Sequence, residues 1–161
     1  MHIAHHITPL GQVQITADDE FITSVIIEPQ ILEDPTQKHP LLQLAIEQLD
    51  EYFEGKRTTF NLPLKQPGTP FQQEVWQQLL EISYGKTISY AQLSKQMKNP
   101  LAIRAIAASN GKNKLWVMVP CHRVIGSDGS LTGYAGGLWR KQWLLEHEAN
   151  VSGQGQTKLA F

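Results

Sequence analysis

The residue with the greatest chemical potential in this chain is its single cysteine, Cys121, which lies in the segment Pro120-Cys121-His122-Arg123-Val124. Thiolate is the reactive form of cysteine, and a nearby imidazole or guanidinium lowers the cost of forming it. Neighbouring side chains in an extended segment point to opposite sides, so His122 needs a third group to orient it. A lone intracellular cysteine is more often a small buried apolar residue than a nucleophile, and both interpretations stay open at this point.

The count of one cysteine limits the chemistry further. It excludes an intramolecular disulfide and a zinc site of the multi-cysteine kind. His2, His5 and His6 suggest a metal cluster, but a strand-end or tail cluster of histidines is the better interpretation, and we expect no metal. The sequence contains no glycine-rich phosphate loop and no dinucleotide fingerprint, so we expect no cofactor.

Composition excludes several classes of protein. The 161 residues are 41% hydrophobic and 18% charged, which argues against a disordered or low-complexity chain. No stretch approaches the roughly 18 consecutive apolar residues of a membrane helix. The N-terminus has no basic run leading into an apolar segment, so we expect a cytoplasmic protein that is not bound to a membrane.

Charge is divided unevenly along the chain. The net charge is −1, yet residues 1–68 hold four basic and ten acidic side chains, whereas residues 69–161 hold ten basic and five acidic. Residues 86–141 hold nine basic side chains and one acidic side chain, Asp128. This segment is either an ordinary solvated basic face or a polyanion-binding site, and charge counting leaves the two about even.

Hydrophobic patterning predicts a mixed α/β fold in the first third of the chain. Strands are predicted over Gln12–Thr16, Phe21–Ile27 and Thr58–Leu62. A helix between the second and third strands begins at Pro40 and ends near Gly55. The segment 63–68 breaks both periodicities where the charge changes sign. We therefore predict an N-terminal domain over residues 1–65, a second domain over 69–150 and a polar tail over 151–161.

Helices dominate the predictions for the second domain. Thr69 caps a helix that stops near Gly85, Ser89 caps a second helix, and Asn99-Pro100 separates it from a third that ends at Asn110-Gly111. The second and third helices have the proportions of a helix-turn-helix or of an ordinary helical hairpin. An apolar, strand-like run over 115–119 leads into Cys121. The last helix, 138–148, is predicted to bury Leu138, Trp139, Trp143, Leu144 and Leu145.

Several motifs together carry a family resemblance: Thr69-Pro70-Phe71-Gln72-Gln73-Glu74-Val75-Trp76, Ile88-Ser89-Tyr90, Arg104-Ala105-Ile106, Asn113, the segment 120–124, Gly133-Tyr134-Ala135-Gly136-Gly137-Leu138, and the segment 141–148. On these motifs the sequence resembles the O6-alkylguanine-DNA alkyltransferases, also called methylated-DNA-protein-cysteine methyltransferases. The resemblance implies an α/β (α+β) fold with a small ribonuclease-H-like N-terminal domain. It also implies a mostly helical C-terminal domain like a winged helix-turn-helix.

The resemblance assigns the catalytic roles. Cys121 would take the alkyl group from guanine O6 by in-line displacement, activated by His122 through a water, with Glu148 orienting the ring. Such an orienting carboxylate is the third group that His122 needs. Taken alone, Glu148 would be an ordinary acid near a helix end.

The resemblance also assigns roles in DNA and base binding, because a stacked guanine must be rotated out of the duplex before its O6 can be attacked in line. Arg104 would fill the gap in the base stack, and Tyr90 would crowd the 3′ phosphate and donate to guanine N3. The alternatives are a phosphate contact for Arg104 and a core position for Tyr90. Ser89, Asn110 and Arg123 would be further DNA contacts.

Five groups would contact the base or shape its site. The Tyr90 hydroxyl and the backbone N–H of Ala135 would assist departure of O6. The carbonyls of Cys121 and Val124 would accept hydrogen bonds from the exocyclic amine. Asn113 would tie the turn that precedes the active-site segment.

The function implied is repair of double-stranded DNA containing O6-alkylguanine by one irreversible transfer per molecule, carried out by a monomer. Whether O4-alkylthymine is also a substrate stays open. One alternative is an alkyltransferase-like protein that flips and marks the lesion, but those relatives replace the cysteine that this chain keeps. A thiol hydrolase is the third and most remote alternative.

Overall fold

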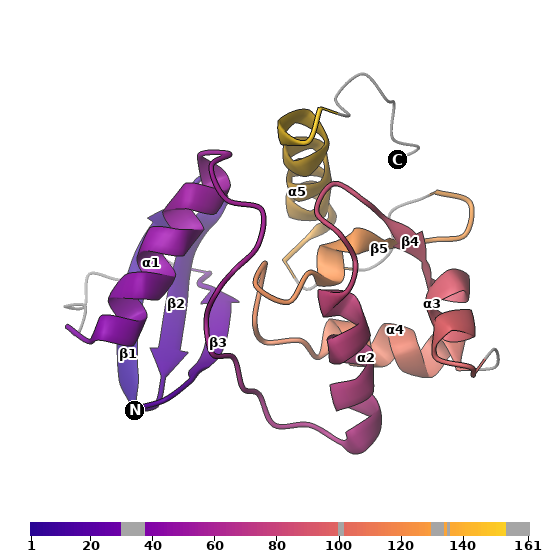
Figure 1. Ribbon diagram of the computed structural model, residues 1–161, viewed down its shortest axis with the longest axis horizontal. Coiled ribbons are helices and arrows are strands. Elements are labelled where there is room, and N and C mark those ends of the chain that lie inside the picture. Colours follow the sequence, from indigo (N-terminus) through magenta and orange to yellow (C-terminus); the bar gives the residue numbers. More distant parts are fainter. Residues whose placement is uncertain (30–37, 100–101, 130–133, 135, 154–161) are drawn as a thin grey trace. The chain divides into compact units, whose positions relative to one another are not determined.

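A computed structural model describes residues 1–29, 38–99, 102–129, 134 and 136–153 (Figure 1). The chain forms two compact units. The first contains Met1–Pro67 together with Lys114–Met118, and the second contains Gly68–Asn113 and the chain from Val119 onward. Among the described residues, no helix is both long and apolar enough to cross a membrane.

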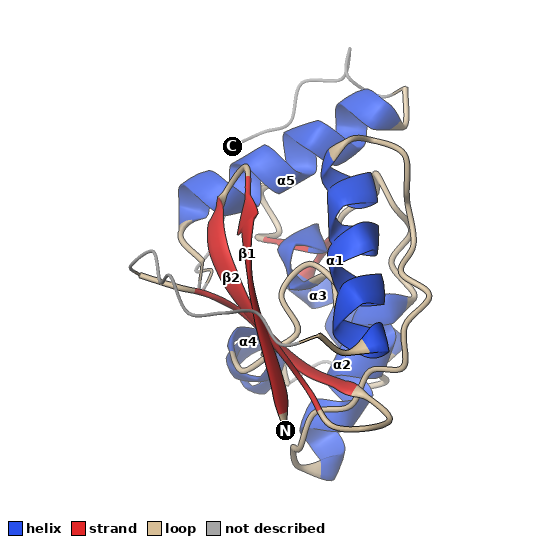
Figure 2. Ribbon diagram, turned by 90° about the vertical axis from the view of Figure 1, so that its left-hand side faces the viewer, coloured by secondary structure: helices blue, strands red, loops and turns tan. Residues whose placement is uncertain are grey.

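A three-stranded antiparallel sheet and one helix form the first unit. The strands are β1 (His2–Thr8), β2 (Gly11–Ala17) and β3 (Ile22–Ile27), in the order β1-β2-β3, and α1 (Pro40–Phe53) lies along one face of the sheet (Figures 1 and 2). His39 caps α1 by accepting a hydrogen bond from the backbone N–H of Leu41. Alternating strand residues and one helix face supply the core, which includes Val13, Ile15, Leu42, Leu49 and Tyr52.

One strand of this unit was missed, and one strand prediction was wrong. No strand was predicted at β1, where histidines interrupt the apolar pattern. Conversely, Thr58–Leu62 forms no strand, and the chain touches the sheet only beyond it, where Leu64 makes an isolated bridge to Ile22. The β-branched residues of this segment favour a strand, but in the part of the chain that the structure describes the segment has no neighbouring strand with which to pair.

The segment 114–118 returns to the first unit just before the cysteine. The Val25 backbone N–H donates to the Lys114 carbonyl, and the Trp116 N–H donates to the Val25 carbonyl. The run was predicted to be strand-like, but it makes a single bridge, between Leu115 and Val25, and then turns. Residues 115–118 are nonetheless buried, with Val117 held at φ 68°. A β-branched residue in this left-handed region is strained.

The second unit begins with α2 (Pro70–Leu80). Thr69 and Gln72 form a capping box, each side chain bonding the other residue's backbone N–H. The Trp76 indole donates to the Ser109 carbonyl at 2.9 Å, which ties α2 to the end of α4 (Ile103–Gly111). An added Cβ at Gly68 would lie 2.6 Å from the Trp76 ring, so only glycine fits there without displacing the indole.

Helices α3 (Tyr90–Gln96) and α4 contact each other, as a helix-turn-helix requires (Figure 1). Ser89 is the N-cap of α3, as predicted, and shares a second capping box with Gln92. Helix α3 ends before Lys98, which has φ 56°. Pro100, predicted to separate the two helices, lies outside the described residues.

A short parallel pair brings distant segments together. In β4 (Ile88–Ser89) and β5 (Val124–Ile125), Ile88 aligns with Val124 and Ser89 with Ile125. The start of α3 is thereby placed beside the cysteine segment, which forms a 3₁₀ turn, η1 (Cys121–Arg123).

The last helix, α5 (Leu138–Val151), has a different buried face from the one predicted. Leu138 and Trp139 are 48% and 56% exposed, because they precede the turn at which the buried stripe begins. Leu144 and Leu145 are buried, as predicted. The rest of the buried face is formed by Lys141, Glu148 and Ala149.

Candidate active site around Cys121

The 3₁₀ turn η1 presents three consecutive side chains to the interior of the second unit. Cys121 is 7% exposed and His122 is fully buried. The Cys121 backbone N–H donates to the Val119 carbonyl at 2.8 Å, and the Arg123 N–H donates to the Pro120 carbonyl at 3.1 Å. The turn replaces the extended backbone expected for this segment.

Glu148 of α5 fixes the imidazole of His122. The distance from His122 Nε2 to Glu148 Oε2 is 2.6 Å, and both side chains are buried. An ionised carboxylate only accepts hydrogen bonds, so the imidazole must carry its proton on Nε2. That tautomer leaves a lone pair on Nδ1, which has no hydrogen-bond partner among the described residues. The ring is therefore oriented as a base through Nδ1.

Burial and local charge set the protonation states of this group. Burial by itself raises the pKa of Glu148, but the facing His122 and Arg123 outweigh it and hold that pKa far below its usual range. Burial lowers the pKa of His122 against the opposing pull of Glu148. Burial also raises the pKa of the Cys121 thiol, despite hydrogen bonds from Asn113 and Tyr134 and the charge of Lys141. The resting site thus holds a carboxylate, a neutral imidazole and a thiol.

Arg123 belongs to the interior and not to a DNA-facing surface, which corrects its predicted role. Its Nε donates to Glu148 Oε1 at 2.8 Å, and its Nη1 donates to the Ile82 carbonyl at 2.7 Å. The side chain is 9% exposed. A guanidinium held by these contacts has no free face for a phosphate.

Lys141 is a site residue that the sequence did not reveal. Its side chain is fully buried, and Nζ donates to the Val124 carbonyl at 2.7 Å. Burial lowers the pKa of Lys141 to about 8, although the nearby Cys121 opposes the shift. The available signals were its place at the start of the 141–148 motif and its position seven residues before Glu148, which places both side chains on one helix face.

Two asparagines hold the backbone around the cysteine. Asn113 Nδ2 donates to the Val119 carbonyl at 3.0 Å, which is the tie expected for it. Asn110 was predicted to contact DNA, but it is 4% exposed and donates to Tyr90 Oη at 3.2 Å and to the Cys121 carbonyl at 3.3 Å. Asn110 therefore links Tyr90 to the cysteine segment from within the unit.

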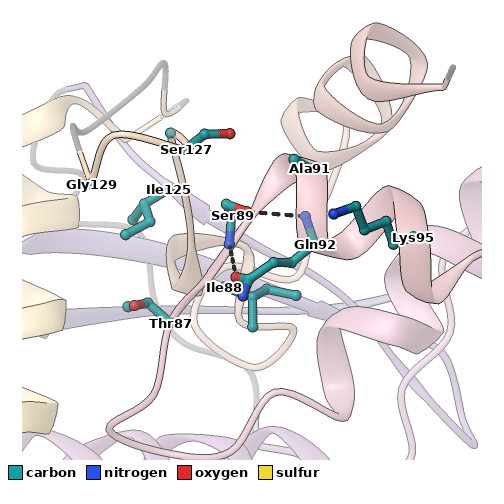
Figure 3. Close-up of a pocket in the computed structure, with 10 residues that line it drawn as sticks. Thr87, Ile88, Ser89, Ala91, Gln92, Lys95, Ile125, Ser127 and Gly129 are labelled. Atoms are coloured by element: carbon teal, nitrogen blue, oxygen red, sulfur yellow. Dashed lines mark hydrogen bonds between the residues drawn. The ribbon is translucent and has the colours of Figure 1, made fainter. Parts of the chain in front are cut away.

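Ser89 and Tyr90, the predicted DNA and base contacts, lie at the start of α3. Tyr90 is 8% exposed, and accepting from Asn110 leaves its hydroxyl proton available for another acceptor. Ser89 lines an open pocket of about 360 Å³ between the start of α3 and the loop after β5 (Figure 3). Lys95 and Ser127 also line this pocket. Arg104 is exposed on α4.

The glycine-rich segment is only partly described, and Ala135, predicted to donate its backbone N–H, lies outside the described residues. Gly137 has φ +91° and precedes α5, where a side chain would strain the backbone. At Gly136 an added Cβ would lie 3.0 Å from the Tyr134 ring. These glycines let the chain pass closely beside Tyr134, whose side chain acts to lower the pKa of Cys121.

The histidines of β1 pair with separate carboxylates in the first unit. His2, His5 and His6 contact Asp19, Glu28 and Asp50 at 2.8, 2.9 and 2.7 Å. Within the described part of the chain, His2, Asp19 and His39 are the one group whose possible metal-ligand atoms all lie within 4.8 Å of one another. The rings of His2 and His39 stack, with centroids 4.0 Å apart and an angle of 21° between their planes.

Fold and site together define a protein that pairs a helix-turn-helix with a buried cysteine, histidine and glutamate, a class suited to covalent chemistry on DNA. Residues 2–66 match a family model described as 6-O-methylguanine DNA methyltransferase, ribonuclease-like domain, and residues 70–150 match 6-O-methylguanine DNA methyltransferase, DNA binding domain. The chain belongs to the 6-O-methylguanine DNA methyltransferase family.

Characterised relatives resemble this chain over most of its length. The constitutive methylated-DNA–protein-cysteine methyltransferase of Bacillus subtilis is 44% identical over 137 residues, covering 80% of this chain and 83% of the relative. The methylated-DNA–protein-cysteine methyltransferase of Shigella flexneri is 40% identical, covering 88% and 91%. The crystal structure of Mycobacterium tuberculosis OGT in complex with DNA superposes with a TM-score of 0.86 at 39% identity, covering 94% of each chain.

Proposed function

We propose that this protein repairs O6-alkylguanine in double-stranded DNA by transferring the alkyl group to the sulfur of Cys121. The observation that carries the proposal is the contact between His122 Nε2 and Glu148, which leaves His122 Nδ1 without a hydrogen-bond partner among the described residues, in the residue that follows the single cysteine. The names of the relatives, methylated-DNA–protein-cysteine methyltransferases, support the same reaction. The DNA complex of the M. tuberculosis protein supports DNA as the partner.

The transfer is a single displacement at carbon. As the thiol proton moves to His122 Nδ1 through a water, the sulfur electron pair forms the new S–C bond and the C–O6 bond breaks. That bond's electron pair stays on guanine, which takes up one proton, and we assign the supply of this proton to the Tyr90 hydroxyl. His122 then returns its proton to the solvent or to Tyr90. The products are S-alkylcysteine and intact guanine.

The expected base contacts use carbonyls that the fold already holds in place. The Cys121 carbonyl accepts from Asn110, and the Val124 carbonyl accepts from Lys141. Each carbonyl oxygen has two lone pairs, so each can accept a second hydrogen bond from the exocyclic amine of guanine. We retain the Ala135 N–H as a proposed donor to O6. Arg104, exposed on α4, is the proposed wedge in the base stack.

The reaction consumes the protein. A thioether is not on the reversible part of the cysteine oxidation ladder, and a chain with one cysteine has no second thiol to resolve it. We therefore propose one turnover per molecule. We also propose that the protein is a monomer that acts on double-stranded DNA in the cytoplasm.

A titration with duplex DNA carrying radioactive O6-methylguanine tests the proposal. We expect label to reach one equivalent per chain and then stop, and Cys121→Ser to acquire none. Tight lesion binding without label would instead favour a lesion-marking protein. Transfer that continues past one equivalent, or repeated turnover of an ester or peptide, would contradict stoichiometric repair.

A further inference from the structure

The Arg123 guanidinium makes contacts in the active site that the proposed reaction does not use. Its Nη2 donates to Glu148 Oε2 at 3.1 Å, in addition to the bond from Nε to Oε1 at 2.8 Å. Oε2 is the same oxygen that accepts the His122 Nε2 proton at 2.6 Å. One buried carboxylate is thus shared between a permanent cation and an ionisable ring.

Sharing the carboxylate changes what the imidazole does. A carboxylate that faces only an imidazole favours the imidazolium ion, which donates from both nitrogens and cannot act as a base. A bidentate guanidinium already balances the charge of Glu148 and repels a second positive charge on the ring. Burial lowers the pKa of His122 most, Glu148 raises it, and the charges of Arg123 and Lys141 lower it further.

Of the other groups that face His122, Lys141 also lowers its pKa, but the Lys141 ammonium bonds a backbone carbonyl. Lys141 and Glu148 face it from α5, and Cys121 lies beside it in η1. Lys141 donates to the Val124 carbonyl, whereas Arg123 is the cation bonded to Glu148 among the described residues. Tyr84, next to Arg123, has its pKa raised to about 12 by burial and by Glu148, so it stays neutral at physiological pH. Arg123 is also anchored to the segment after α2 through the Ile82 carbonyl.

We propose that Arg123 is a positioning residue that keeps His122 neutral, with its proton on Nε2, so that Nδ1 can accept the Cys121 proton. The inference rests on the proposed alkyl transfer. It assigns to Arg123 a role in setting the protonation state of the His122 imidazole, and this role is separate from DNA binding.

The test is the pH dependence of single-turnover transfer from the free base O6-benzylguanine, which requires no DNA contact. The proteins compared are wild type, Arg123→Gln, Arg123→Lys and the matched control Arg57→Gln. Arg57 also pairs with a glutamate, Glu51, at 3.1 Å, but in the first unit. We expect the acid limb of the Arg123→Gln rate profile to move up by about one pH unit. At the acid end of the profile, the transfer rate of this variant should then be roughly tenfold lower than that of wild type. Arg123→Lys should shift less, and Arg57→Gln should not shift.

The amplitude of transfer separates this role from a purely structural one. Amplitude counts correctly folded molecules, so a folding defect lowers it without moving the midpoint of the rate profile. A lowered amplitude with an unmoved midpoint would overturn the inference. If Arg123→Gln yields no active molecules, the pKa of the His122 ring is measured by NMR titration in Arg123→Lys. A ring pKa above that of wild type would support the inference, and an equal ring pKa would overturn the inference. If the wild-type protein transfers no alkyl group, only the proposed function is contradicted, because the NMR titration measures the pKa of His122 without any transfer reaction.

Discussion

At the scale of single residues, the site shows how a poor nucleophile can be kept ready without being ionised. Burial raises the pKa of Cys121 and lowers that of His122, so neither carries a charge at rest. A standing thiolate would be costly in this interior. In the proposed reaction, proton transfer to His122 Nδ1 therefore accompanies alkyl transfer.

Glu148 makes stability depend on pH. A carboxyl whose folded pKa lies below its unfolded value of about 4.3 contributes stability that is fully present above that pH, and this stability is lost progressively as pH falls from there toward the folded pKa. We expect Glu148→Gln to destabilise the protein by about 3–5 kcal/mol at pH 7, since it leaves the buried Arg123 without a counter-charge. The difference from wild type should narrow below about pH 4.

Urea unfolding at pH 7 and at pH 3.5 measures this difference. Glu51→Gln is the control, because Glu51 pairs with Arg57 while 45% exposed and should cost little at either pH. A gap between Glu148→Gln and wild type that stays constant across pH would refute the electrostatic explanation.

At the scale of elements, short segments deliver the reacting groups. The two-residue ladder of β4 and β5 places Tyr90 next to the cysteine segment, although 31 residues separate them in sequence. Helix α5 supplies both Lys141 and Glu148 from one buried face, about two turns apart. Lys141 and Glu148 therefore lie on the buried face of α5, whereas Glu148 taken alone in the sequence would be an exposed acid near a helix end.

The capping boxes of α2 and α3 allow the two possible roles of Ser89 to be separated. Ser89 accepts the Gln92 N–H at 3.0 Å, and Thr69 accepts the Gln72 N–H at 3.1 Å. Each substitution by alanine should therefore lower the free energy of unfolding by about 1 kcal/mol. We expect only Ser89→Ala to weaken DNA binding, since its hydroxyl also faces the pocket beside Lys95 (Figure 3). Equal DNA affinities for the two variants, measured by fluorescence anisotropy, would assign Ser89 to capping alone.

Helix α4 carries the proposed wedge. Removing Arg104 should slow repair of duplex DNA by on the order of tenfold or more, because unstacking a base step costs a few kcal/mol, while leaving reaction with free O6-benzylguanine nearly unchanged. Lys112→Ala, which removes another exposed cation near the end of α4, is the control for a general loss of charge. Equal losses for Arg104→Ala on both substrates would contradict a role in base extrusion.

At the scale of the whole molecule, sequence patterns predicted those elements whose determinants are local. The caps Thr69 and Ser89 and the α1 start at Pro40 were found where predicted, because each rests on residues within one turn. Thr58–Leu62 failed as a strand, since a strand needs a partner that local composition does not specify.

The same distinction holds for the site. The mixed α/β fold could be predicted from local hydrophobic patterning. The family could be predicted because each motif, such as 120–124 or 141–148, is a short continuous segment of the sequence. The burial of Arg123, Asn110 and Lys141 depends on contacts made across 11 to 41 residues, which no local pattern encodes. Two of the nine basic side chains counted in residues 86–141 are therefore interior groups and add nothing to a DNA-facing surface.

The mass of the intact protein before and after reaction with a duplex carrying O6-methylguanine tests the central claim most directly. We expect each chain to gain the mass of one methyl group, located by peptide mapping on Cys121, and the DNA to contain unmodified guanine. An unchanged protein mass with repaired DNA, or a methyl group on any other residue, would contradict transfer to this thiol.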